Sequence, residues 1–384
     1  MDFKLSEEQQ LLHNTMRRWA QNVFGGLVQL EAARSQPWGF SAANWAELAE
    51  LGLLSLPFAK ADGGLGGGPT ELMIVMAELG RALAPEPYLA STILAGGALS
   101  FAGSDAQRAA MMPRLMEGGL RLAFAHDEVQ ARYDLYDVAT IASASEGGFC
   151  LNGRKALVLN GDGADMLVVS ARTSGAPRDE AGISLFLVPA DADGVDIATF
   201  RTHDGGRAAD VQLSNVFVAS SEILGPVGSA LPVIERVAQN AIAALCAEAV
   251  GVIEALCELT VEHLKTRRQF GIAIGSFQIL QHKVVDMFVA LEQARSMALY
   301  AAMMLQEDNT QERRIALSAA KVQINTSARF VGQTAVQLHG GIGMTMEYMG
   351  AQYFRRLAMI ERMFGDTPYH LHHVMTGGGL VNAS

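Results

Sequence analysis

The chain has 384 residues, which exceeds what one hydrophobic core usually supports, so two or three domains are expected. Half of the residues are apolar, only 18% are charged, and the formal net charge is −11. The acidic balance excludes general nucleic-acid binding, which needs a basic surface, and the low charged share indicates surface that is buried between subunits. Three scattered cysteines are too few for a disulfide framework or a zinc site, so no metal is expected.

The first residues are acidic and amphipathic, and they lack the charged-then-apolar pattern of a signal peptide. No uninterrupted run of 18 apolar residues occurs, so no membrane span is expected. The sequence therefore predicts a cytoplasmic protein.

Helical periodicity dominates the first part of the chain. Apolar side chains recur at helical spacing over residues 5–19 and 45–54, and again over 71–81 and 89–116. The glycine-rich stretch 62–69 separates these helices and lacks the Gly-Lys-Ser/Thr ending of a nucleotide P-loop. We interpret it as a turn between helices, with a phosphate site as the alternative.

The composition changes near residue 120. From residue 122 to 218, short β-prone runs alternate with turn signals. Asn152-Gly153 and Asn160-Gly161 each follow an apolar run, and Asn-Gly between such runs predicts a hairpin turn. This part is predicted to be an antiparallel β domain.

After Gly225-Pro226 the helical period returns. Four helices are predicted, which favours a four-helix bundle, over residues 233–268, 277–305, 312–338 and 359–375. The fold class is therefore α+β, with an N-terminal α domain, a middle antiparallel β domain and a C-terminal helical bundle at residues 1–119, 120–226 and 227–384.

Two blocks in the last third carry chemistry. The first is Arg267-Arg-Gln-Phe-Gly271 with Gly275-Ser-Phe-Gln278, and the second is Gln337-Leu-His-Gly-Gly-Ile-Gly343. An arginine at a helix end suits the helix dipole, but a guanidinium also fits a diphosphate, and Phe270 offers a face to a ring system. The glycines of the second block allow backbone N–H groups to approach an anion closely.

In their α–β–α setting, these blocks resemble the acyl-CoA dehydrogenase family along the whole chain, closest to the small-subunit type of pimeloyl-CoA dehydrogenases. The resemblance implies an FAD flavoprotein of fatty acid or steroid catabolism that oxidises an acyl-CoA thioester at Cα–Cβ to the 2,3-enoyl-CoA. It also implies an electron-transfer flavoprotein as acceptor. The assembly would be a homo- or heterotetramer, the latter with a large-subunit-like partner.

The resemblance further implies a flavin that lies between subunits. Arg267 would hold the FAD diphosphate of a neighbouring subunit, and Gln337 and Gly341 would be contacts from the partner chain. The implied cofactor contacts are Phe124, Asp127, Arg267, Gln269, Phe270, Gln278, Gln337, Gly340, Gly341 and Thr367.

The β domain departs from the family where the flavin ring is expected. Leu157 and Leu159 stand in place of a tryptophan and a threonine, and Asp127 replaces another hydroxyl. A carboxylate at 127 opposes the negative charge of reduced flavin. On the substrate side we expect Arg132, Tyr133 and Glu248, with Arg132 as a partner for a terminal carboxylate.

The chemistry needs a carboxylate base at the substrate α-carbon. The family's usual glutamate position holds Gly365, and Asp366 follows it. Asp366 acts as the base from a shifted position, or the position is vacant and Asp366 is a turn residue, or another residue such as Glu248 serves. The family's alternative base position falls on Ala241, which offers no carboxylate, and the histidines at 370, 372 and 373 are interpreted as structural or exposed.

Three functions follow. The leading one is a catalytic acyl-CoA dehydrogenase subunit with FAD. The second is a non-catalytic subunit that lends Arg267 and the 337–343 loop to a partner's flavin. The third is a flavin oxidase or monooxygenase on the same scaffold.

Overall fold

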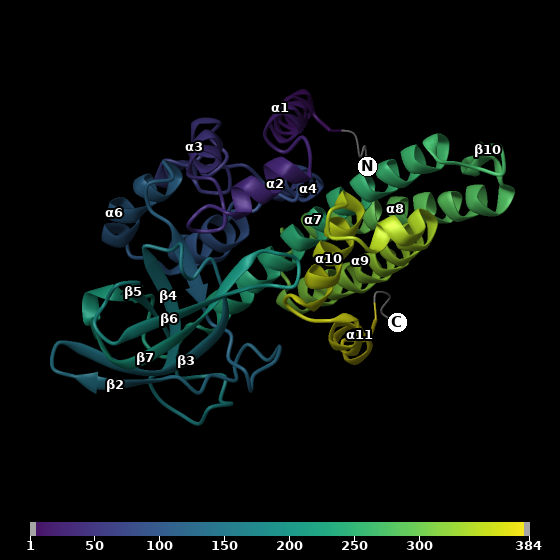
Figure 1. Ribbon diagram of the computed structural model, residues 1–384. Coiled ribbons are helices and arrows are strands. Elements are labelled where there is room, and N and C mark those ends of the chain that lie inside the picture. Colours follow the sequence, from purple (N-terminus) through teal and green to yellow (C-terminus); the bar gives the residue numbers. More distant parts are fainter. Residues whose placement is uncertain (1–4, 380–384) are drawn as a thin grey trace. The chain divides into compact units, whose positions relative to one another are not determined.

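The computed structural model describes residues 5–379 (Figure 1). The chain forms two compact units. The helical unit comprises the chain through Ala32, Gly68–Ala84 and everything from Ile242 onward, and the β unit comprises Ala33–Gly67 and Pro85–Ala241. These units are spatial groupings, so the predicted sequence boundaries at 119/120 and 226/227 stay a prediction.

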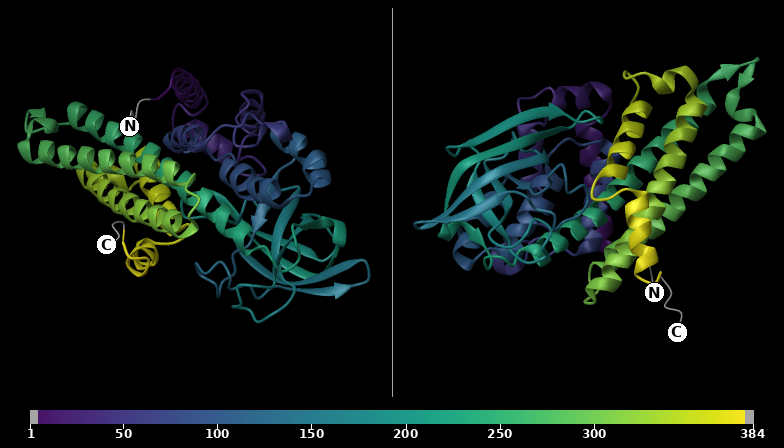
Figure 2. Two further views of the ribbon diagram at one scale, coloured as in Figure 1. Left: turned by 180° about the vertical axis from the view of Figure 1, so that it is seen from behind. Right: turned by 90° about the horizontal axis from the view of Figure 1, so that it is seen from below.

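The helical unit is built on long helices of the C-terminal part, to which two N-terminal helices are added. Helices α8 and α9 run along each other, and α10 and α11 pack on α9 (Figures 1 and 2). Alanines dominate the contact between α7, α8 and α9, which lets these helices approach closely. The helices are α1 (Glu7–Val23), α4 (Pro69–Ala82), α8 (Gln278–Met304), α9 (Thr310–His339), α10 (Met349–Arg362) and α11 (Thr367–Thr376), and α2 (Leu27–Arg34) and α7 (Leu231–Thr266) cross the unit boundary.

Glycines fix the crossing of α4 and α7. A Cβ placed on Gly80 would collide with the backbone of Glu248, and one on Gly251 would collide with the carbonyl of Ala77. Only glycine permits this distance between the two helix backbones. The crossing therefore holds α4 against the middle of α7.

The predicted helices 233–268, 277–305 and 312–338 are confirmed, with small shifts at their ends. The predicted helix 359–375 is wrong, because a turn at residues 363–366 separates α10 from α11. Phe364 and Gly365 both have positive φ in this turn, which a helix does not tolerate.

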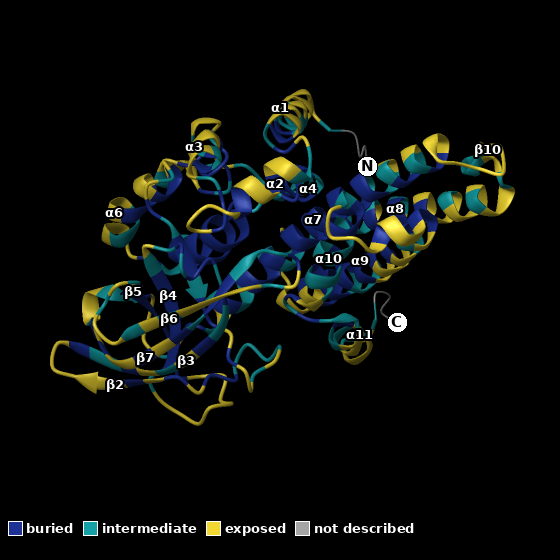
Figure 3. Ribbon diagram, in the orientation of Figure 1, coloured by how far each residue is buried: buried dark blue, intermediate teal, exposed yellow. Residues whose placement is uncertain are grey.

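The β unit contains a single eight-stranded sheet. Its strand order is β6-β7-β3-β2-β4-β5-β8, and β1 pairs with β4 in parallel. The strands are β1 (Leu122–Ala125), β2 (Ile141–Ser145), β3 (Gly148–Leu159), β4 (Met166–Arg172), β5 (Ile183–Pro189), β6 (Val195–Arg201), β7 (Arg207–Ala219) and β8 (Ile223–Leu224). Figure 3 shows the buried stripe of the sheet in dark blue, which comes from side chains such as Leu151, Leu167 and Phe186.

Helices of the N-terminal part complete the β unit. The buried π-helix η2 packs on β1, and the Ser91 hydroxyl accepts a hydrogen bond from the Leu122 backbone N–H at 3.0 Å. The predicted helical run 89–116 is thus divided into three elements. The helical elements here are α3 (Ala42–Glu50), η1 (Lys60–Asp62), η2 (Tyr88–Ala95), α5 (Gly96–Ala102), α6 (Asp105–Met116) and η3 (Ser220–Glu222).

Neither Asn-Gly pair forms the predicted hairpin. Asn152-Gly153 lies inside β3, which continues to Leu159 with a register shift at this point. Gly153 is needed because a Cβ there would lie 2.7 Å from the Cα of Thr140 on the neighbouring segment. Asn160-Gly161 does form a turn at the end of β3, with Asn160 in the left-handed region, but β4 after it pairs with β1, β2 and β5 rather than with β3.

Between residues 5 and 379, no helix has the length and apolar character that a membrane crossing requires.

Candidate functional site

The two C-terminal sequence blocks come together at one end of the helical unit. His263, one turn before Arg267, packs against His339, with ring centroids 4.5 Å apart. His339 also contacts Tyr348, at 5.1 Å between ring centroids. The end of α7 is thereby joined to the end of α9, and the predicted Arg267 and Gly340 segments belong to one surface.

The side chains of this surface point outward rather than into the chain. Phe270 is 90% exposed and adopts a positive φ of 53° at the tip between β9 (Arg268–Gln269) and β10 (Ile272–Ala273). The Phe270 ring makes an edge contact with Phe277 at 6.2 Å between ring centroids, yet packing within the chain leaves most of the Phe270 side chain uncovered. The other exposed members of the predicted set are Arg267, Gln269, Gln278, Gln337, Gly340 and Gly341.

The glycines after α9 leave open space above the backbone. They lie in the short helix η5 (Gly340–Met344). Gly340 has a φ of 65°, a conformation that favours glycine, whereas the φ of Gly341 is not positive. A Cβ added at either position would meet nothing within 4 Å. Neither packing nor backbone strain within this chain therefore requires glycine at 341. A ligand or second chain that approaches the backbone closely would require it.

A buried polar cluster supports the predicted flavin-facing segment of the β unit. We call it the Lys155 cluster, made of His126, Glu128, Thr140, Lys155 and Ser170. The Lys155 ammonium is fully buried and donates to the Glu128 carboxylate at 2.6 Å, the Ser170 hydroxyl at 3.0 Å and the His126 carbonyl at 3.2 Å. Glu128 also accepts the backbone N–H and hydroxyl of Thr140. The charge of Lys155 and these hydrogen bonds overcome burial and hold the pKa of Glu128 at about 2.

The cluster fixes the positions of the predicted flavin contacts beside it. Phe124 stacks on His126 with ring centroids 5.7 Å apart. The Asp127 carbonyl accepts a hydrogen bond from the Ala156 N–H at 2.8 Å, so Asp127 lies next to Leu157. The Asp127 side chain reaches solvent, yet the protein packed around it raises its pKa to about 6. Near neutral pH a fraction of this carboxyl is therefore protonated and able to donate a hydrogen bond.

The two residues that replace the ring-facing family residues are both half-buried. Leu157 has a positive φ of 52°, and its N–H donates to Asp210 at 3.3 Å. Leu159 ends β3. Neither side chain carries a hydrogen-bonding group, so this part of the unit can offer only apolar contact to a flavin ring.

The predicted substrate residues belong to different units. Arg132 is exposed with a positive φ of 54°, and Tyr133 is half-buried; both lie in the loop after Glu128. Glu248 lies on α7, is buried, and forms a twofold ion pair with Arg356 of α10 at 2.5 and 2.9 Å. The Arg356 guanidinium engages both carboxylate oxygens of Glu248. Glu248 would have to lose this ion pair before it could act as a catalytic base.

The turn between α10 and α11 contains the predicted base. Asp366 is the N-cap of α11, and its Oδ1 accepts the Tyr369 N–H at 3.0 Å. Gly365 has a φ of 110°, and a Cβ there would lie 2.5 Å from both His370 Nε2 and Tyr369 Cδ1. Thr367 begins α11 and is half-buried. Position 365 therefore carries no side chain and has no space for one.

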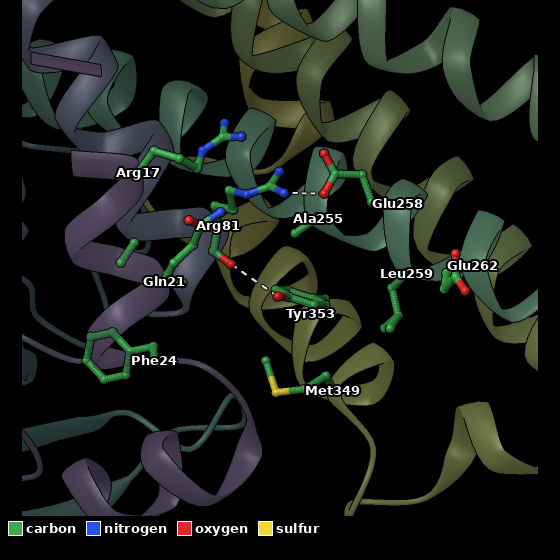
Figure 4. Close-up of a pocket in the computed structure, with 12 residues that line it drawn as sticks. Arg17, Gln21, Phe24, Arg81, Ala255, Glu258, Leu259, Glu262, Met349 and Tyr353 are labelled. Carbon is green, nitrogen blue, oxygen red and sulfur yellow. Dashed lines mark hydrogen bonds and ion pairs between the residues drawn. The ribbon is translucent and has the colours of Figure 1, made fainter. Parts of the chain in front are cut away.

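A separate cavity of about 360 Å³ opens among α1, α4, α7 and α10 (Figure 4). Its two arginines already have partners, because Arg17 pairs with Glu78 at 2.6 Å and Arg81 pairs with Glu258. Tyr353 donates to the Arg81 carbonyl at 3.1 Å. None of the predicted site residues lines this cavity, and it is distinct from the surface that carries the two blocks.

Comparison with known proteins decides the family. Successive parts of the chain match the N-terminal domain (residues 6–119), the middle domain (123–216) and the C-terminal domain (231–377) of acyl-CoA dehydrogenases. The chain belongs to the acyl-CoA dehydrogenase family. Its members are oxidoreductases that act on CH–CH groups and use FAD.

Individual relatives cover almost the whole chain. It is 28% identical to acryloyl-CoA reductase (NADH) of Anaerotignum propionicum, over 96% of this chain and 94% of the relative. It is 30% identical to the mitochondrial isovaleryl-CoA dehydrogenase of Solanum tuberosum, over 83% of this chain and 77% of the relative. Among solved structures, the ChsE4-ChsE5 complex of Mycobacterium tuberculosis is similar with a TM-score of 0.86 and 25% identity, over 98% of both chains.

The residues of this chain fit the family's cofactor on one side. The exposed Arg267 is suited to a diphosphate, Phe270 to an aromatic ring system, and the open backbone at Gly341 to a close contact. When bound, FAD would supply the two-electron acceptor of the reaction. On the β side, Phe124 and Asp127 are available, while Leu157 and Leu159 offer no hydrogen bond.

Sequence patterns indicate few of the buried polar groups. Lys155 occupies a buried position of β3, four residues after the buried Leu151, and this break in the apolar pattern is the signal that could have found it. Lys321 and His370 are also fully buried, and no pattern distinguishes them from exposed helix residues. Their partners become visible only when α9, α10 and α11 are packed together.

Proposed function

We propose that this chain is the flavin-site-completing subunit of a heteromeric acyl-CoA dehydrogenase whose partner supplies the catalytic base. The single observation that carries the proposal is position 365. The family's base position holds a glycine, and the space beside it is filled by His370 and Tyr369. The neighbouring Asp366 is engaged as a helix cap.

The outward-facing surface supports a role in completing a partner's flavin site. Arg267, Phe270 and the Gly340–Gly341 backbone are all exposed. Exposed apolar side chains continue from this tip along α8, where Ile279, Val285, Phe288 and Val289 are each about half or more exposed. Apolar stretches of this kind mark subunit interfaces.

The reaction of the assembly is the oxidation of an acyl-CoA thioester to the 2,3-enoyl-CoA. A base removes the α-proton, the β-hydrogen leaves with its electron pair to FAD, and a double bond forms between Cα and Cβ. An electron-transfer flavoprotein then accepts the two electrons. The similarity to the ChsE4-ChsE5 complex supports a heteromeric assembly. A heterotetramer in fatty acid or steroid catabolism is what the pimeloyl-type resemblance of the sequence implies. Arg132 is the candidate partner for a carboxylate at the far end of a dicarboxylic substrate.

A second candidate is a homomeric dehydrogenase that uses Asp366 as the base. One observation favours it: Asp366 is only half-buried, and its N-cap hydrogen bond engages Oδ1 alone. In that case Asp366→Asn abolishes substrate-dependent flavin reduction in the protein purified alone. Under the heteromer proposal, the same variant leaves the turnover of the assembly within about twofold of the wild type.

Substitution of Arg267 tests directly whether this chain contributes a contact to the FAD of a partner subunit. The adjacent Arg268 is the matched control. In the assembly formed with the large-subunit-like partner, Arg267→Ala should weaken FAD binding by about 10- to 100-fold, because a charge-assisted contact to a phosphate is worth about 1.5–3 kcal/mol. Arg268→Ala should change it little. The measurement is FAD retention by equilibrium dialysis, and equal losses in both variants would contradict the proposed contact.

A further inference from the structure

The turn between α10 and α11 has a backbone that only glycine permits at its centre. Phe364 and Gly365 have φ values of 54° and 110°, both in the region that L-residues rarely adopt. A side chain at 365 would leave the backbone toward two rings, with its Cβ 2.5 Å from both His370 Nε2 and Tyr369 Cδ1. The conformation of the turn and the positions of these two rings together exclude a side chain here.

His370 is held in place by two elements. Its ring is buried, with 1% of the residue exposed. Nε2 lies 2.9 Å from the Phe364 carbonyl oxygen, and Nδ1 lies 3.2 Å from the Ser318 hydroxyl of α9. Since a carbonyl can only accept, Nε2 carries the proton and Nδ1 accepts from Ser318. His370 therefore ties the left-handed residue Phe364 to α9.

Lys321 holds the same turn from the α9 side, one helical turn beyond Ser318. Its buried ammonium donates to the Ile360 carbonyl at 2.5 Å and to Asn325 Oδ1 at 3.1 Å. Ile360 lies in the last turn of α10, where carbonyls lack helical partners and favour a positive charge. Ser318, Lys321 and His370 thus fix both the end of α10 and the turn that follows it.

We propose that His370 is the positioning residue that closes the base position of this chain. It fills the space beside the Cα of residue 365 and, through the Phe364 carbonyl, keeps the turn in the conformation that only glycine adopts. A carboxylate cannot be installed at 365 while His370 holds this conformation of the turn. It becomes possible when residue 370 is small, because the turn is then released from the Phe364 tie and can move away from Tyr369. The role of this closure in removing a catalytic base rests on the proposed function. The coupling between residues 365 and 370 is independent of the proposed function.

A double-mutant cycle on the full chain measures this coupling. Gly365→Ala adds only the Cβ and should lower Tm by roughly 5 °C or more, because it introduces both the clash and positive-φ strain. His370→Ser removes the ring and the bond to the Phe364 carbonyl, so the turn can relax. In that background the same Gly365→Ala change should lower Tm by less than half as much.

His370→Gln separates positioning from simple loss of the ring. Glutamine can still donate to the Phe364 carbonyl and still fills the space, so Gly365→Ala should remain as costly in that background as in the wild type. Additive shifts in the serine background would overturn the proposal, and so would a Gly365→Ala variant that is as stable as the wild type.

The functional arm uses Gly365→Glu. With His370 present, this variant should be unfolded or strongly destabilised in circular dichroism, whereas Gly365→Glu/His370→Ser should fold. A well-folded Gly365→Glu single variant contradicts the closure. Counting flavins per chain tests the proposed function separately, and its outcome does not alter the 365–370 coupling.

Discussion

Each unit of the molecule contains a buried lysine beside a histidine and a serine. In the Lys155 cluster of the β unit, His126 Nδ1 lies 2.9 Å from the Ser170 hydroxyl. In the Lys321 cluster of the helical unit, made of Ser318, Lys321, Asn325 and His370, His370 Nδ1 lies 3.2 Å from the Ser318 hydroxyl. Both lysines are 0% exposed.

The two clusters differ in what neutralises the ammonium group. Lys155 has the Glu128 carboxylate at 2.6 Å, whereas the hydrogen bonds of Lys321 go to the carbonyl of Ile360 and the amide oxygen of Asn325. Burial without a directly bonded carboxylate lowers the pKa of Lys321 to about 8. The β cluster is therefore an ion pair, and the helical cluster is a charged cap on the end of α10.

This difference explains what each cluster positions. The Lys155–Glu128 pair holds the segment that carries Phe124 and Asp127, the flavin contacts predicted from the sequence. The Lys321 cluster holds the turn that carries Gly365 and Asp366, the predicted base position. The first supports a segment whose side chains remain available, and the second supports a turn without space for a side chain.

The largest expected effect comes from removing Lys155. Lys155→Met leaves the buried Glu128 carboxylate without its counter-charge, which costs about 3–5 kcal/mol in unfolding free energy. The double variant Lys155→Met/Glu128→Gln removes the stranded charge and should recover a large part of the loss. Urea unfolding monitored by fluorescence measures the unfolding free energy of both variants. A double variant no more stable than the single one would show that the loss in Lys155→Met does not come from the ion pair.

Acid should destabilise both clusters through their histidines. Burial lowers the pKa of His126 and of His370 from 6.5 to about 3, so each is neutral in the folded protein and takes up a proton on unfolding. The stability contributed is fully present above pH 6.5 and is lost as the pH falls from 6.5 toward 3. From pH 7 to pH 5 each histidine should cost about 2 kcal/mol.

Variants of the two histidines separate these contributions. His370→Asn should reduce the loss between pH 7 and pH 5 by about 2 kcal/mol, and His126→Asn should do the same independently. The check is urea unfolding at half-unit pH steps for the wild type and both variants. A pH slope that neither variant changes would assign the acid sensitivity to other groups.

The smallest effect is expected from Lys321→Met. This change removes a charge and leaves only neutral acceptors behind, so it should cost about 1–2 kcal/mol, well below the cost of Lys155→Met. Measured under the same urea conditions, an equal or larger loss than in Lys155→Met would contradict the assignment of the two clusters as ion pair and cap.

The sequence predicts the long elements of this fold well and the polar interior poorly. Helical periodicity over 233–338 and the β-prone runs after residue 120 are local signals, and the structure confirms them. Asn152-Gly153 is misleading because its glycine serves a close approach to Thr140 rather than a turn. The break between α10 and α11 does have a local signal, since Gly365, the N-cap Asp366 and Pro368 are typical of a helix boundary, but the apolar periodicity over 359–375 conceals it.

The candidate site follows the same division. The exposed Arg267 and Gly341 segments stand out in the sequence because their chemistry is unusual for a helix end. The closure of position 365 was not predictable, since a glycine there is equally compatible with a mobile turn and with a filled space. Only the coordinates of Phe364 and His370 distinguish the two.

The most direct test of the central claim is the number of flavins per chain. The protein is purified alone and together with the base-bearing, large-subunit-like partner, and FAD and protein are quantified in each sample. A flavin-completing subunit predicts no stoichiometric FAD and no acyl-CoA-dependent flavin reduction in the chain alone. It predicts one FAD for each pair of unlike chains in the assembly. One FAD per chain in a homomer that oxidises acyl-CoA would contradict it.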